Sequence, residues 1–260
     1  MAYALLDGVF AGIIGNVPLM AVKAMGATDV QLQLPLAMTS VGLFASVFTG
    51  VGMATRRKKP FVLLPGFAGA ISAFLMAWMN SGAWFLGISG LISIFDFAMR
   101  PAVPSIIRIV YPEHCRAHVA GTMRQYASIV LLCSTLLSAS LLAASGNQVR
   151  HMSQMQLVLA GFAGMAAFAC FRQLPDHGDG SAEEAIPSRD EGYGWVTFSP
   201  LRDRMFRRYL AIFFVFGSAN LFHSGIVPAF FARDMGLGYT QATLLIHVIP
   251  NVCAFLSGAV

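Results

Sequence analysis

Two opposite charges, Asp96 and Arg100, lie four residues apart inside a long apolar segment of the sequence. On a helix this spacing puts both side chains on one face, where they can form an ion pair. A charge at the centre of a bilayer costs about 3 kcal/mol on insertion scales, so such residues usually pair or face a water-filled cavity. Two hypotheses therefore stay open: a clamp within one helix, or a site that presents charge to a substrate or a proton.

Further polar residues lie in other apolar segments. Asn16 is deep in the first one, where its amide can bind a substrate or hydrogen-bond a neighbouring helix. Near the end of the sequence, Asn220 precedes His223 by three residues, and His247 precedes Asn251 by four. A histidine titrates near neutral pH and can relay protons, or it can serve as a structural hydrogen-bonding partner. We take Asn16, Asn220, His223 and His247 as further candidates for substrate binding or coupling.

Motifs of enzymes are missing from the sequence. It contains no GxSxG, no HExxH and no P-loop, which argues against an enzyme and against transport driven by its own ATP hydrolysis. Its four cysteines form no CxxC pair and have no histidine at metal-ligand spacing. We therefore expect no metal and no cofactor.

The composition indicates a membrane protein. Hydrophobic residues make up 57% of the chain and charged residues 11%, with a mean hydropathy of +0.68. The apolar residues come in blocks of about 20, the length of a membrane-spanning helix. The net charge of +5 comes from basic residues between these blocks, so we interpret it as a topology signal rather than a nucleic-acid surface. The expected fold is an all-α polytopic membrane protein surrounded by lipid.

Eight spans are predicted, at 2–22, 34–54, 61–79, 83–110, 117–144, 155–171, 209–231 and from 240 onward. The first contains Asp7 close to its start, where we expect a carboxylate at the level of the lipid headgroups. The fourth is longer than a minimal span and contains Pro101 and Pro104, which can bend a helix. Segment 175–200 is rich in Gly, Ser, Asp and Glu, which predicts a flexible interdomain loop.

The basic residues predict the orientation. Four consecutive cations at 56–59 separate the second and third spans, and short basic loops stay in the cytoplasm. With this loop inside, thirteen Lys and Arg residues fall on the cytoplasmic face, and three, Lys23, Arg150 and Arg233, fall on the other. We expect a multi-pass protein of a bacterial inner (plasma) membrane with its N-terminus in the cytoplasm.

The loop between the second and third spans carries a resemblance to a known family. Gly50, Lys58 and Lys59 match positions of a signature that reads Gly, three residues, Asp, a basic residue, any residue, Gly and two basic residues. The Asp, the first basic residue and the second Gly are replaced here by Ala54, Thr55 and Arg57. In this loop, and in segment 111–121 with its Arg116 and Gly121, the chain resembles the major facilitator superfamily.

The resemblance implies two six-helix bundles joined by a cytoplasmic loop. On that pattern, 1–173 is the first bundle, 174–207 the loop, and 208–260 the first two helices of an incomplete second bundle. The expected chain is thus one truncated after the eighth span, or a fragment of a twelve-helix protein.

The resemblance also implies secondary active transport of a small molecule by alternating access, with proton coupling left open. The family's fourth helix lines the central cavity, which favours a role for Asp96 and Arg100. Conformational gate candidates are Gly50, Lys58, Lys59, Arg116 and Arg124. The alternative is a non-transporting membrane anchor or assembly factor on the same scaffold.

Overall fold

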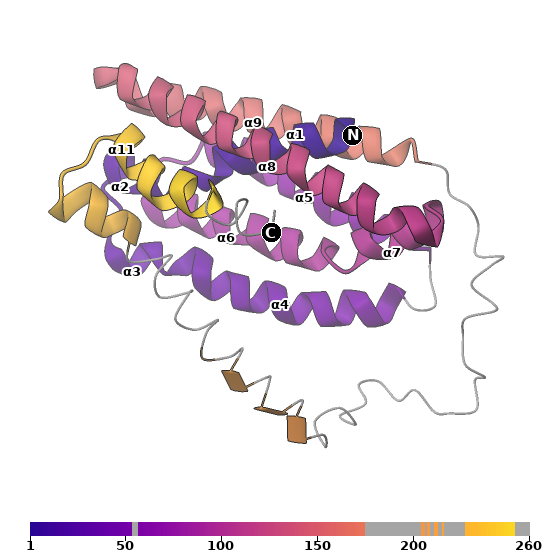
Figure 1. Cartoon of the computed structure of the whole chain (residues 1–260). Helices are drawn as coiled ribbons and strands as arrows, with labels where there is room; N and C mark the ends of the chain where they lie inside the picture. Colours follow the sequence, from indigo (N-terminus) through magenta and orange to yellow (C-terminus); the bar gives the residue numbers. More distant parts are fainter. Residues whose placement is uncertain are drawn as a thin grey trace.

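The computed structural model describes residues 1–53, 57–174, 204–205, 207–208, 211–212, 215 and 227–252. Throughout these residues the regular structure is helical, and no strand occurs in them. The long helices lie side by side in an elongated bundle (Figure 1). Six segments are long and apolar enough to cross a membrane: Ala2–Met25, Asp29–Gly50, Pro60–Ala77, Gly82–Val110, Glu113–Ala144 and Gly146–Arg172. The prediction of an all-helical protein with several helices able to cross a membrane is confirmed for this part of the chain.

The first and fourth spans are each broken into two helices. In the first, α1 (Ala2–Gly15) ends at Asn16, and α2 (Val17–Met25) begins with a proline, Pro18, in its first turn. In the fourth, α6 (Gly82–Met99) and α7 (Ala102–Val110) are separated by Arg100 and Pro101. A proline has no backbone N–H to continue the helical hydrogen bonds, which accounts for a break at each of these places.

The other four spans are continuous. They are α4 (Leu34–Met53), preceded by the short α3 (Asp29–Leu32), then α5 (Pro60–Ala77), α8 (Glu113–Ala144) and α9 (Val149–Arg172). Helix α8 begins four residues before the predicted start. The sixth span was predicted to begin at 155, but α9 begins six residues earlier, because the 3₁₀ turn Gly146–Gln148 already reverses the chain. Gly146 has a φ of 52°, which a glycine adopts without strain, so α9 can begin at once and carry the remaining polar residues.

The helix packing has an internal two-fold pattern. Helix α1 packs on α8 and α9, α6 packs on α4 and α5, and α5 packs on α9. Exchanging the first three spans with the last three converts α1 into α6, α4 into α8 and α5 into α9. This exchange maps the contacts of α1 onto those of α6, and it maps the α5–α9 contact onto itself. Because three spans are an odd number, the two halves run in opposite directions, as in an inverted repeat.

Small residues bring the helices close together. A Cβ atom on Gly161 of α9 would lie 2.7 Å from the ring of Phe74 on α5, which is too close for two carbon atoms. Glycine therefore lets these two helices approach at the Phe74 ring, as small residues do in membrane helix pairs. By contrast, α4 keeps large apolar side chains exposed, Phe44 at 71% and Phe48 at 67%, as expected of a helix that faces lipid.

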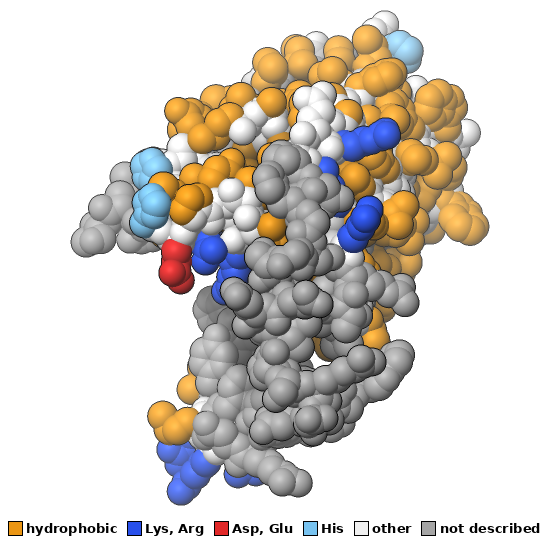
Figure 2. Space-filling model, turned by 90° about the vertical axis from the view of Figure 1, so that its right-hand side faces the viewer, with side chains coloured by type: hydrophobic (Ala, Val, Ile, Leu, Met, Phe, Trp, Pro, Cys, Tyr) orange, Lys and Arg blue, Asp and Glu red, His pale blue; other side chains and the backbone are white. Residues whose placement is uncertain are grey.

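The two ends of the bundle are distinct. At one end, here called the basic end, Lys59 Nζ donates to the carbonyl of Arg172 at 3.1 Å and ties the start of α5 to the end of α9. Figure 2 looks onto the side of the molecule where α7 lies, and it shows Lys and Arg side chains there with hydrophobic side chains along the flank. At the opposite end, Arg150 donates to the side chain of Asn80.

A helical hairpin covers the end opposite the basic end. It consists of residues 227–252, with the π-helix η3 (Phe230–Asp234), α11 (Tyr239–Thr243) and the π-helix η4 (Leu244–Val248). It packs against α2 and α8, and its helices lie beside α2 in Figure 1. Arg233 pairs with Asp29 and donates to the carbonyl of Ala27, while Lys23 donates to the carbonyl of Leu237. These contacts join the hairpin to the first two spans.

Candidate functional site

A cavity of about 450 Å³ lies between the two broken spans. Helix α1 and the start of α2 line it with residues at helical spacing: Asp7, Phe10, Ala11, Ile14, Gly15 and Pro18. Helix α6 and the break after it contribute Phe95, Met99 and a set with the same spacing: Ser89, Ile92, Ser93, Asp96, Phe97 and Arg100. Both sets follow the pattern i, i+3, i+4, i+7, i+8 and i+11, so each is one face of a helix. Helices α4 and α5 and the ring of Phe168 on α9 complete the walls.

The ion pair expected between Asp96 and Arg100 is present. Both Nε and Nη2 of Arg100 donate to Oδ2 of Asp96, at 3.0 and 2.7 Å. The guanidinium also lies over the ring of Phe97, 3.9 Å from its centroid, in a cation–π contact. The two side chains remain 59% and 41% exposed, so the pair is not enclosed by protein. The positive charge of Arg100 is therefore largely balanced by its own helix, at the edge of the cavity.

Asp7 is a site residue that the sequence did not single out. It was expected at the lipid headgroups, but the structure places it on the cavity wall opposite α6. Within the part of the chain that the structure describes, its carboxylate forms no hydrogen bond and no ion pair. The sequence did contain one sign of this position. Asp7 lies at helical spacing from Phe10, Ile14 and Pro18, which puts its carboxylate on the same helix face as the proline at the break.

Asn16 and His247 lie behind the cavity, at the junction with the hairpin. Asn16 is fully buried, and its Nδ2 donates to the carbonyl of Thr135 on α8 at 2.9 Å. Its Oδ1 accepts a hydrogen bond from Thr243 of α11 at 3.0 Å. His247 lies against the backbone of Gly15, itself a cavity residue. In this conformation both polar groups of Asn16 are engaged by protein, and two candidates far apart in the sequence meet at the break of the first span.

Two further candidates, Asn220 and His223, lie outside the described residues. The flexible loop predicted over 175–200 also lies outside them, as does most of the seventh predicted span, 209–231.

The gate candidates gather at the basic end. Arg116 donates from Nε to the carbonyl of Tyr111 at 2.9 Å and lies 3.9 Å from the carboxylate of Glu113. These contacts fix the turn that leads from α7 into α8. Lys58 adjoins Lys59 in the turn before α5, and Arg124 is exposed on α8. Space around Gly50 is open, since no atom lies within 4 Å of the place its Cβ would take.

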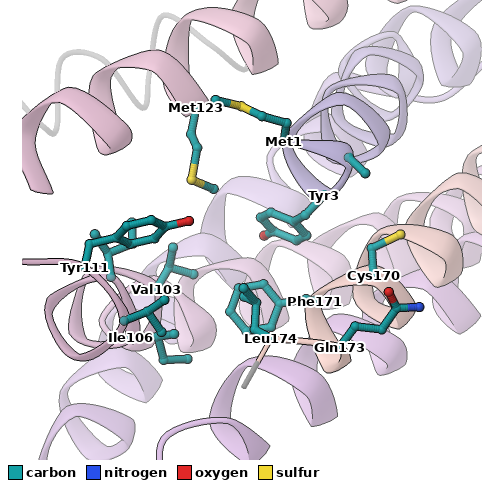
Figure 3. A pocket seen from close by; sticks show the side chains of 13 residues that line it. Met1, Tyr3, Val103, Ile106, Tyr111, Met123, Cys170, Phe171, Gln173 and Leu174 are labelled. Atoms are coloured by element: carbon teal, nitrogen blue, oxygen red, sulfur yellow. The ribbon is translucent and has the colours of Figure 1, made fainter. Parts of the chain in front are cut away.

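A second, smaller cavity of about 210 Å³ lies at the basic end (Figure 3). Residues of α1, α7, α8 and α9 line it, and Figure 3 shows Tyr3 and Tyr111 on opposite sides with Met123 between their helices. No Asp, Glu, Lys, Arg or His side chain belongs to its lining. Its walls are thus largely apolar, unlike those of the first cavity.

An aromatic contact separates the two cavities. The Tyr3 ring, in the wall of the small cavity, meets the Phe168 ring, in the wall of the large one, edge to face with centroids 5.8 Å apart. Tyr3 also contacts Phe171 in the same manner at 5.1 Å. The contact of Tyr3 with Phe168, here called the partition, therefore lies between the linings of the two cavities.

Across the described residues, no group of three or more His, Cys, Asp or Glu side chains is placed to hold a metal ion. The chain matches no protein-family model, and no curated protein is similar to it.

Proposed function

We propose that this protein is a secondary active transporter that resembles the major facilitator superfamily, and that the cavity between α1 and α6 is its substrate site. One observation carries the proposal: the two broken spans occupy corresponding positions of the internal repeat, and they face each other across a charged cavity. Interrupted spans at corresponding positions of two repeats are the best pointer to a transporter's binding site.

The chemistry of the cavity fits this role. Asp7, Asp96 and Arg100 are costly in a membrane unless they pair or meet water, and all three line one cavity. A transporter needs such groups near the substrate, because they bind it or carry the coupling ion. In our proposal Asp96 and Arg100 act in binding or coupling, and the remaining walls give the substrate an apolar surround.

Contacts at the two ends of the bundle support a gating scheme. The hairpin is held to α2 and α3 by Arg233 with Asp29 and by Lys23, which closes the end opposite the basic end. Toward the basic end, the partition of Tyr3 and Phe168 is the barrier that we assign between the cavity and that end. Alternating access then requires that one set of contacts opens while the other is closed, as one three-span repeat moves against the other about the cavity.

Flux measurements test the proposal against the alternative of a non-transporting anchor or assembly factor. The protein, reconstituted in liposomes, is exposed to panels of labelled organic cations, organic anions, sugars and amino acids with a pH gradient of either sign. We expect accumulation of at least one class above that of protein-free liposomes. Accumulation equal to that of protein-free liposomes for every class would favour the anchor.

A further inference from the structure

The charges that line the large cavity are unequal. Two carboxylates and one guanidinium give a net charge of −1 when all are ionised. Arg100 gives both of its short hydrogen bonds to Asp96, so these two charges balance each other on one helix. The carboxylate left over is Asp7 of α1, which has no hydrogen-bonding or ionic partner among the residues that the structure describes.

We propose that this cavity binds an organic monocation with an apolar body, and that Asp7 holds its charged group. This inference rests on the proposed function, because it takes the same cavity as the substrate site. It goes further by assigning the substrate class and the residue that selects it.

Aromatic rings around the carboxylate favour such a ligand. Phe10 belongs to the same helix face as Asp7. Phe95 and Phe97 of α6 and Phe168 of α9 line other walls of the cavity. The face of an aromatic ring attracts a cation, most strongly where water is displaced. One of these rings, Phe97, already holds the guanidinium of Arg100 at 3.9 Å. A ligand cation beside Asp7 would meet the same kind of surface.

The hydroxyl groups of the cavity argue against sugars. Thr39 donates its hydroxyl proton to the carbonyl of Pro35 at 2.9 Å, and Ser93 donates to the carbonyl of Ser89 at 3.3 Å. Two of the three hydroxyl groups in the described lining therefore donate within their own helices, and the third belongs to Ser89. An anion is disfavoured as well, because Arg100, the single cationic side chain among the described lining residues, is already paired with Asp96.

The size of the cavity agrees with a drug-sized ligand. Pockets for small molecules measure about 300–1,000 Å³ and are mostly apolar with a few placed polar groups. At about 450 Å³, this cavity lies in the lower half of that range. A compact cation with several alkyl or aryl groups would fill it, whereas a metal ion would leave most of it empty.

The test uses two ions of the same shape and opposite charge, tetraphenylphosphonium and tetraphenylborate, with the purified protein from the complete gene. Equilibrium dialysis in detergent measures both affinities, and detergent without protein gives the partitioning to subtract. We expect saturable binding of the phosphonium and none of the borate. Asp7→Asn should weaken phosphonium binding about tenfold or more, as when one partner of a desolvated charge contact is removed.

Matched variants isolate the role of Asp7. Glu113→Gln removes a carboxylate that is 93% exposed at the start of α8, and it should leave binding unchanged. Equal binding of both ions, or wild-type phosphonium binding in folded Asp7→Asn, would overturn the proposal.

A second measurement covers the case in which Asp7→Asn fails to fold. In protein freed of its native cysteines, Ser93→Cys places one thiol on the cavity wall. Phosphonium should slow its reaction with a maleimide, and borate should not; equal protection by both ions would contradict the assignment.

Binding does not require transport, so selective binding without flux would refute the proposed function alone. Flux of a neutral or anionic substrate without cation selectivity would refute this inference alone.

Discussion

Thr243 Oγ1 donates a buried hydrogen bond of 3.0 Å to Oδ1 of Asn16. The bond ties the break in the first span to the hairpin, while Nδ2 of the same amide holds α8 through the carbonyl of Thr135. Three helical segments therefore meet at one side chain. This geometry matches the hypothesis of a polar contact between helices, which stood beside that of substrate binding.

We predict that Asn16→Leu destabilises the protein. It leaves the carbonyl of Thr135 and the hydroxyl of Thr243 without their partner in a buried place, at a cost of about 1–3 kcal/mol. Thermal unfolding in detergent measures the loss. Thr243→Val breaks only one of the two bonds and should cost less. The double variant Asn16→Leu with Thr243→Val measures the interaction between the two side chains. If its loss of stability equals the sum of the two single losses, the contact has no energetic role.

The ion pair on α6 is the subject of the second prediction. Asp96→Asn and Arg100→Gln each leave one charge without its partner, and the double variant removes both. Single variants of fully buried pairs lose about 3–5 kcal/mol, and we expect less here because both side chains are more than a third exposed. The double variant should recover the expression and thermal stability of the wild type.

Transport distinguishes the two hypotheses for this pair. A structural clamp predicts normal flux in the folded double variant. Our proposal predicts a stable protein with little substrate-dependent flux, because the charges line the cavity and act in binding or coupling. Wild-type flux in that variant would assign the pair to stability alone.

The third prediction concerns the partition between the cavities. Tyr3→Ala removes a ring that packs edge to face against Phe168 and Phe171, and so connects the large cavity with the basic end. A cysteine at position 93 should then react several-fold faster with a maleimide applied at the basic end. Tyr126→Ala removes a ring that is exposed on α8 and serves as the control. An unchanged rate in Tyr3→Ala would mean that this ring is no barrier.

The sequence predicted the spans better than the site. Blocks of apolar residues were enough to locate six spans, because each must cross the same thickness of hydrocarbon. Helix ends were less certain: α9 begins at Val149 because Gly146 turns the chain early, and polar residues such as Arg150 can continue on a helix at a membrane surface. The spacing of Asp96 and Arg100 predicted their ion pair because both lie on one helix.

Features that depend on packing between helices were not predictable in the same way. Asp7 was assigned to the headgroups because its distance from the start of the span was the only evidence used. Its place on the cavity wall depends on how α1 is rotated against α6, which a single helix does not determine. The contact of Asn16 with Thr243 likewise requires the hairpin to fold back over the first bundle.

The fourth prediction tests the orientation in the membrane. The structure puts the turn before α5 and the turn before α9 at opposite ends, since Lys59 contacts Arg172 at the far end of α9. In protein freed of native cysteines, Asn147→Cys should react with an impermeant maleimide added outside intact cells. Lys58→Cys should react only after the membrane is opened. Labelling of position 58 and not of position 147 in intact cells would invert the orientation.

The most direct test of the central claim is the accessibility of Ser93→Cys from the two sides of the membrane. Ser93 lies on the cavity wall between Asp96 and the Ser89 carbonyl that it binds. An impermeant maleimide is applied to right-side-out and to inside-out vesicles made from the complete, otherwise cysteine-free protein. Alternating access predicts that the thiol reacts from both sides, and that a bound ligand changes the two rates in opposite directions. Reaction from one side only, whatever ligand is added, would contradict a transporter and favour an anchor.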